Sequence, residues 1–134
     1  MEIAYLILCH KNIMQLKLLI NQLANEYTDV YIHVDSKFGN IESLREEDVT
    51  LVDDRERVDV RWASFSMTTA TLNLINKCLS SGRKYDYVFL ISGQDFPIKN
   101  IMNMAIATTG DHVEHDVAIR ALDWSLFPFP FLSL

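Results

Sequence analysis

The chain has 134 residues, of which 49% are hydrophobic and 22% are charged, and its net charge is −6. This length allows one compact domain, and the composition predicts a folded chain rather than a disordered one. The acidic net charge argues against a general nucleic-acid-binding protein, which needs a cationic surface. The chain has no run of about 18 apolar residues, so we expect no membrane-spanning helix.

Strand and helix patterns alternate from the first residues onward. The apolar run Ile3–Cys9 predicts a strand that is buried on both faces. Asn12 is a suitable N-cap for a helix that ends near Tyr27, because apolar residues follow it at helical spacing. The next predicted elements are a strand, a polar loop with one helical turn and a third strand, at residues 30–34, 35–48 and 49–52.

The second half of the pattern holds another helix and strand. Residues 58–60 predict a short extra strand, and Ser64 or Ser66 caps the next helix. Gly82 lies where that helix should end, and residues 85–91 predict a fourth strand. The expected buried side of the helix consists of Met67, Ala70, Leu74, Ile75, Cys78 and Leu79. This order of elements predicts an α/β domain with a mainly parallel sheet.

The pattern changes after residue 99. Residues 100–134 have weak periodicity, and two prolines in the aromatic run 126–132 forbid a regular helix there. We therefore expect residues 1–99 to form one structural part and residues 100–134 to form a divergent tail, whose aromatic run suits a partner surface. Cys9 and Cys78 are expected to be reduced core thiols in a cytoplasmic protein, or in one peripheral to a membrane.

Polar clusters follow the predicted strands. Residues 9–11 and 35–37 end the first two strands, residues 61–64 follow the third, and residues 92–95 end the fourth. The carboxyl ends of parallel strands meet at one sheet edge, where open α/β sheets bind ligands. The clusters therefore predict a ligand site, although ordinary solvated strand ends would give the same pattern.

Single residues in these clusters allow more than one interpretation. His10 and His33 are metal-ligand types, but no third ligand stands at metal spacing. Trp62 suits stacking on a base or core packing, and Gly93 suits a close ligand approach or a plain turn. Asp95 could coordinate a cation, orient a sugar hydroxyl or cap a turn. The glycines form neither G-x-G-x-x-G nor a P-loop, which argues against dinucleotide and Walker-type sites.

Four stretches together resemble the core-2/I-branching N-acetylglucosaminyltransferase family, which also contains peptide O-xylosyltransferases. They are residues 4–11, 31–37, 60–66 and 90–99, and the last contains the letters SGQDFPIK. The resemblance extends over residues 3–99. It implies a GT-A type α/β fold, a Rossmann-like and mainly parallel sheet flanked by helices, here with an incomplete C-terminal half. It also implies transfer of N-acetylglucosamine or xylose from a UDP-sugar, with inversion, to a glycan or protein hydroxyl.

The resemblance also implies which residues bind the donor and that no metal takes part. His10, Asp35 and Trp62 would hold the uridine, and Gln94 and Asp95 would border the sugar pocket. The full implied set is Leu8, Cys9, His10, Asp35, Ser36, Lys37, Trp62, Gln94 and Asp95. A cation on a diphosphate usually needs two nearby carboxylates, whereas Asp95 has Gly93 where the second acid would be.

Residues 100–134 depart from the family pattern, so we expect the chain to be the N-terminal, donor-binding part of such an enzyme. No residue is assigned as the general base, because the family's base lies far downstream of the SGQD motif. Two alternatives remain. One is an inactive remnant that binds only UDP or a partner chain, and the other is an unrelated nucleotide-binding α/β module.

Overall fold

The computed structural model describes residues 2–61 and 63–97. Trp62 and the predicted tail at residues 100–134, with its aromatic run, lie outside these ranges. The described elements in chain order are β1 (Ile3–Cys9), α1 (Ile13–Leu23), β2 (Thr28–Val34), α2 (Glu42–Arg45), β3 (Thr50–Leu51), the 3-10 helix η1 (Asp54–Glu56), α3 (Phe65–Ser80) and β4 (Tyr87–Ser92).

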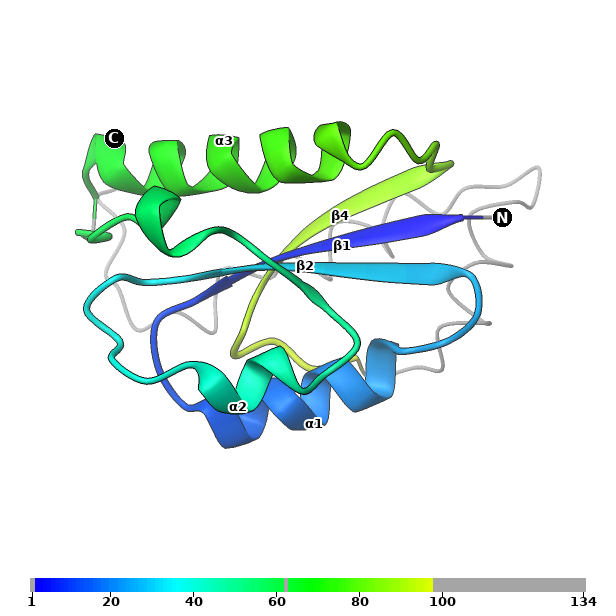
Figure 1. Ribbon diagram of the computed structural model, residues 1–134, viewed down its shortest axis with the longest axis horizontal. Coiled ribbons are helices and arrows are strands. Elements are labelled where there is room, and N and C mark those ends of the chain that lie inside the picture. The colour runs from blue at the N-terminus through cyan, green and yellow to red at the C-terminus, as the bar shows by residue number, and fades with distance from the viewer. Residues whose placement is uncertain (1, 62, 98–134) are drawn as a thin grey trace, which may run out of the picture. The chain divides into compact units, whose positions relative to one another are not determined.

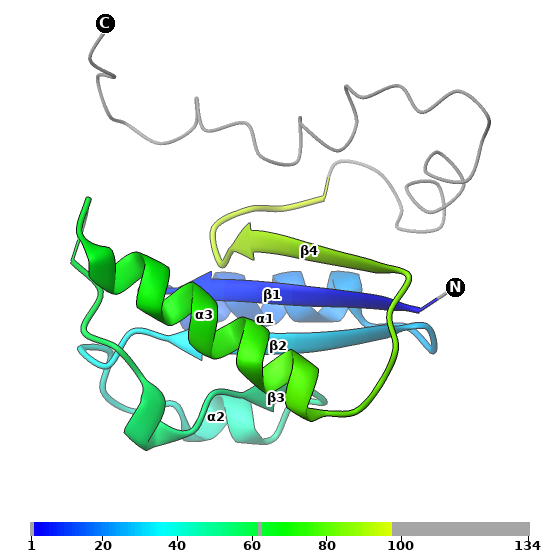
Figure 2. The same ribbon diagram turned by 90° about the horizontal axis from the view of Figure 1, so that it is seen from above.

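The described strands form one parallel sheet in the order β3-β2-β1-β4. The helices cover both faces of this sheet, with α3 above it and α1 and α2 below it in the view of Figure 1. Figure 2 shows the strand order from above, with β1 between β2 and β4. The predicted α/β architecture with a parallel sheet is confirmed.

The strand order reverses at β1. From β1 the chain passes through α1 to β2 and β3 on one side, and α3 then carries it back to β4 on the other side. Leu8 is paired with His33 of β2 and with Ser92 of β4. The carboxyl ends of β1 and β4 therefore form the switch point at which open parallel sheets bind ligands.

The predicted buried side of α3 is confirmed in part, because Ala70, Leu74 and Cys78 are buried. Leu74 and Cys78 pack in one core cluster with Ala4, Leu6, Tyr31 and Val52 of the sheet side. Two predicted members are wrong, because Ile75 is 36% exposed and Leu79 is 72% exposed. Lys77 pairs with Asp53 at 2.9 Å, and Asn73 donates to the carbonyl of Glu56 at 2.7 Å. These bonds hold that flank of α3 against residues 53–56.

Local hydrogen bonds set the ends of the helices. Asn12 caps α1 as expected, since its side chain accepts a hydrogen bond from the backbone N–H of Gln15 at 3.2 Å. The helix ends at Leu23, a turn before the predicted end, because the hydroxyl of Thr28 donates to the Leu23 carbonyl at 2.8 Å. At α3 the expected cap is Ser64, and Gly82 has the positive φ of 70° that favours glycine after a helix.

The extra strand predicted at residues 58–60 is wrong. The backbone N–H of Val58 donates to Nε2 of His33 at 3.0 Å instead of to a neighbouring strand, and the Val58 carbonyl accepts from the N–H of Ser36 at 3.0 Å. Because the N–H of Val58 binds a side chain and not a backbone carbonyl, residues 58–60 do not form the repeated backbone hydrogen bonds of a strand. Within the described ranges, no helix is both long and apolar enough to cross a membrane.

Candidate functional site

The carboxyl ends of β1, β2 and β4 are joined beyond their last paired residues. The N–H of Asp35 donates to the Cys9 carbonyl, and the N–H of Gly93 donates to the Leu8 carbonyl, both at 2.8 Å. Three of the polar clusters predicted from the sequence therefore lie side by side at one sheet edge. Trp62, which was predicted to belong to the same site, lies outside the described residues.

Asp35 is a buried carboxylate that organises its own turn. The residue is only 2% exposed, and its Oδ1 accepts from the backbone N–H of Lys37 at 2.9 Å. Its Oδ2 lies 3.4 Å from the Lys37 ammonium, which also pairs with Asp59 at 2.9 Å. The hydrogen bond to Asp59 raises the pKa of Lys37 and lowers the pKa of Asp59, so both groups are charged at neutral pH. A ligand that binds to the Asp35 carboxylate competes with Lys37 for it.

His10 and Ser36 are exposed polar residues at the ends of β1 and β2, as are Lys11 and Lys37. Desolvation lowers the pKa of His10, and the neighbouring Lys11 lowers it further. The imidazole is therefore neutral at pH 7, where one ring nitrogen donates a hydrogen bond and the other accepts one. Such a ring suits a neutral, hydrogen-bonding ligand group.

Asp95 caps the turn that follows β4. Its Oδ2 accepts from the N–H of Ser92 at 2.7 Å, and its own N–H donates to the Ser92 carbonyl at 3.0 Å. Burial raises the pKa of Asp95, and the hydrogen bond from Ser92 opposes this effect. The Gln94 carbonyl accepts from Nε2 of Gln15 at 2.9 Å, which anchors the turn to α1. Of the three roles suggested for Asp95, the structure shows turn capping.

Gly93 allows β4 to pack closely against β1. A Cβ atom at this position would lie 3.2 Å from Cβ and 3.3 Å from Sγ of Cys9. Cys9 and Cys78 are both free and buried, as expected for core thiols. Burial is the main cause of the raised pKa of Cys9, so this residue is a protonated core thiol rather than a nucleophile.

Sequence reasoning missed one residue that shapes this edge. The side chain of Arg57 is 9% exposed and donates to the backbone carbonyls of Val34, Asp35 and Phe38. In the sequence Arg57 ends the charged run 53–57, which is typical of a solvated surface. No pattern in the sequence distinguishes this buried guanidinium from its exposed neighbours.

Metal binding would need several His, Cys, Asp or Glu side chains close together. In residues 2–61 and 63–97, no three His, Cys, Asp or Glu side chains are grouped so that they could hold a metal ion. Metal independence of the protein stays a prediction.

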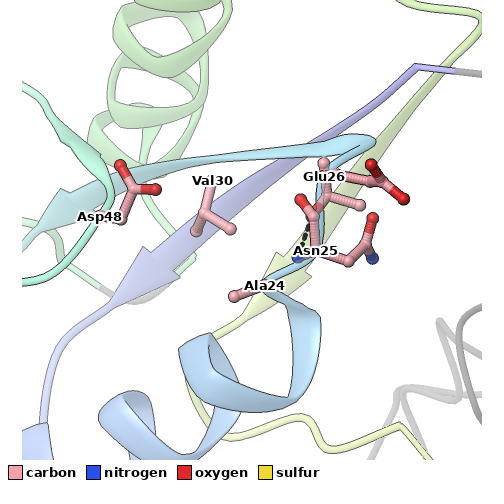
Figure 3. A pocket seen from close by; sticks show the side chains of 6 residues that line it. Ala24, Asn25, Glu26, Val30 and Asp48 are labelled. Atoms are coloured by element: carbon pink, nitrogen blue, oxygen red, sulfur yellow. Dashed lines mark hydrogen bonds between the residues drawn. The ribbon is translucent and has the colours of Figure 1, made fainter.

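A separate open pocket lies at the opposite end of β2. Its volume is about 350 Å³, and Figure 3 shows its polar rim near the end of α1 and the start of β2. It is lined by Ala24, Asn25, Glu26, Thr28, Val30 and Asp48. None of the predicted site residues within the described ranges lines this pocket, so we treat it separately from the candidate site.

The buried imidazole of His33 predicts that stability falls in acid. Burial lowers the pKa of His33 below its ordinary 6.5, and Arg57 adds to this effect whereas Asp35 opposes it. The unfolded chain then takes up a proton before the folded chain does, so stability should fall as the pH drops below 6.5 toward the lowered pKa. We expect this group to contribute a slope of up to about 1.4 kcal/mol per pH unit. Urea unfolding measured between about pH 5 and 8 tests this expectation.

Two variants isolate this effect. His33→Gln removes the titration and offers an amide oxygen to the N–H of Val58, so it should flatten the acid slope. His10→Gln is the matched control, because His10 also has a lowered pKa but is exposed, and it should flatten the slope less. An equal slope in wild type and His33→Gln would contradict the assignment.

Comparison with known proteins shows the family of the chain. A family model described as Core-2/I-Branching enzyme matches residues 3–119. The matched range includes every predicted site residue. It also extends to residue 119, beyond the resemblance at residues 3–99. A comparison with curated proteins finds no match.

Proposed function

Because the chain belongs to the core-2/I-branching enzyme family, we propose that the carboxyl ends of β1, β2 and β4 bind the nucleotide of a UDP-sugar donor. The reaction is the transfer of N-acetylglucosamine or xylose, with inversion, to a hydroxyl of a glycan or a protein. One observation carries the proposal. The family motifs at residues 9–11, 35–37 and 92–95 lie side by side at the switch point of a parallel sheet.

The chemistry of the edge suits a uridine. Uracil presents two carbonyl acceptors on either side of one N–H donor. The neutral imidazole of His10 can donate to a carbonyl or accept from that N–H. The hydroxyl of Ser36 is exposed beside it at the end of β2 and suits the ribose. Asp35 offers a carboxylate acceptor once Lys37 moves away from it.

The charges near the edge favour an anion only weakly. Lys37 is already paired with Asp35 and Asp59, so it adds little net positive charge. Arg61 is 78% exposed and lies 3.9 Å from Asp59, and Lys11 is exposed at the end of β1. These two cations are the groups that we assign to the diphosphate.

Calorimetry with the full chain in the presence of a chelator tests the proposal. UDP should bind, and ADP should bind at least about tenfold more weakly, because adenine lacks the imide pattern of uracil. His10→Ala should weaken UDP binding by about three- to tenfold, the value of one hydrogen bond. Asn21→Ala, an exposed change on α1, is the control and should leave the affinity unchanged.

Two results would overturn this assignment. They are the absence of UDP binding and equal affinities for UDP and ADP. Release of UDP from UDP-N-acetylglucosamine or UDP-xylose, with a glycan acceptor present, tests the transfer step separately.

A further inference from the structure

Two segments far apart in the sequence are joined residue by residue beside the candidate site. Each residue from 33 to 38 contacts at least one of residues 57–60. The contacts are His33 with Val58, Val34 and Asp35 with Arg57, Ser36 with Val58, Lys37 with Asp59 and Val60, and Phe38 with Arg57. The turn that carries Asp35, Ser36 and Lys37 is therefore held along its whole length.

Arg57 makes the largest share of these contacts. Its Nε donates to the Val34 carbonyl at 3.0 Å, and its Nη2 donates to the carbonyls of Asp35 at 2.9 Å and Phe38 at 2.5 Å. Its carboxylate partner, Asp54, is more distant at 3.4 Å. One planar guanidinium thus binds the backbone before, within and after the turn. A lysine ammonium lacks the fork of donors needed to hold all three carbonyls.

From these contacts we propose that Arg57 is a positioning residue of the donor site, which holds the turn at residues 35–37 in its ligand-binding conformation. This inference rests on the proposed binding of UDP at the same edge. Arg57 does not act on the ligand, because its Nε and Nη2 donate to the backbone of residues 34–38 and its Nη1 pairs with Asp54. It acts through the turn, whose exposed Ser36 and buried Asp35 are the groups assigned to the uridine.

The expected effect follows from preorganisation. A turn that is ordered before the ligand arrives does not have to be ordered on binding, and this raises the affinity. Loss of Arg57 leaves the carbonyls of Val34, Asp35 and Phe38 without the guanidinium donors that bind them. The turn should then open locally, while β1 and its pairing with β4 are unaffected.

Arg57→Gln and Arg57→Lys test this role against Arg55→Gln, which removes the same charge from an exposed position in η1. Native-state hydrogen exchange reports the amides of Ser36 and Lys37, which donate to Val58 and to the Asp35 carboxylate. In Arg57→Gln these two amides should exchange at least about tenfold faster, whereas the amides of β1 should match those of Arg55→Gln. The dissociation constant for UDP should rise about tenfold in Arg57→Gln and less in Arg57→Lys.

The outcomes separate this proposal from the proposed function. If wild type does not bind UDP, the proposed function fails, and hydrogen exchange alone decides whether Arg57 holds the turn. If UDP binds equally well to wild type and Arg57→Gln, the positioning role is wrong. Equal acceleration of the turn and β1 amides would show a general loss of stability and would also overturn it. Arg57→Lys keeps the charge and serves if Arg57→Gln does not fold.

Discussion

Replacing Asp35 by Ala is expected to weaken UDP binding by at least about tenfold and to lower the free energy of unfolding by about 2–4 kcal/mol. The carboxylate is buried and accepts from the N–H of Lys37, so its removal leaves that N–H without its partner. The Lys37 ammonium loses one of its two carboxylate partners as well. Calorimetry with UDP and urea unfolding measure the two losses separately.

Asp35→Asn distinguishes the charge of this residue from its role in the turn. The amide oxygen can still accept from the N–H of Lys37, so most of the stability should return. If uracil uses the carboxylate as its acceptor, the affinity for UDP should stay low in Asp35→Asn. Asp59→Asn, which removes an exposed charge from the same lysine, is the control and should not weaken UDP binding. An affinity in Asp35→Ala equal to that of wild type would remove Asp35 from the site.

Replacing Gly93 by Val is expected to lower the free energy of unfolding by about 3 kcal/mol. The new Cβ would lie 3.2 Å from Cβ and 3.4 Å from Cα of Cys9. Cys9 belongs to β1, which is paired on both sides, so its backbone cannot move away without disturbing two strands. The same displacement would separate Gln94 from the end of β1 and weaken UDP binding. Urea unfolding and calorimetry measure both effects.

Gly39→Val is the matched control for this change. A Cβ atom at Gly39 meets no atom within 4 Å, and Gly39 has no positive φ, so the substitution should change stability by less than about 1 kcal/mol. Combining Cys9→Ala with Gly93→Val should recover part of the loss, because it removes the Sγ atom that lies 3.3 Å from the new Cβ. Similar losses at the two glycines would show that the packing of Gly93 against Cys9 is not the cause.

Much of the fold could be predicted because its signals are local. The apolar run Ile3–Cys9 became the central strand, and the caps at Asn12 and Ser64 began the two long helices. The rotation of α3 about its axis could not be predicted in this way. On the flank of α3, Lys77 contacts Asp53 and Asn73 contacts Glu56, and these partners lie 24 and 17 residues away in the sequence.

Only the parts of the candidate site that directly follow a strand could be predicted from the sequence. A strand's last residue marks the edge of a parallel sheet, so residues 9–11, 35–37 and 92–95 could be expected to lie together. No sequence pattern indicates that the Asp35 carboxylate is buried. Nor does any pattern indicate that Arg57 binds three backbone carbonyls. Both depend on the path of residues 57–61 past the turn, which a pattern of apolar and polar residues does not record.

The position of β1 between β2 and β4 has a consequence for the order of folding. Its pairing with β2 closes a short loop through α1, whereas its pairing with β4 must wait until nearly all of the described chain has been synthesised. The half of the edge that carries Asp35 can thus form early on the ribosome, and the half that carries Gln94 and Asp95 forms later. A nascent chain held before β4 would display a sheet whose nucleotide edge is half built.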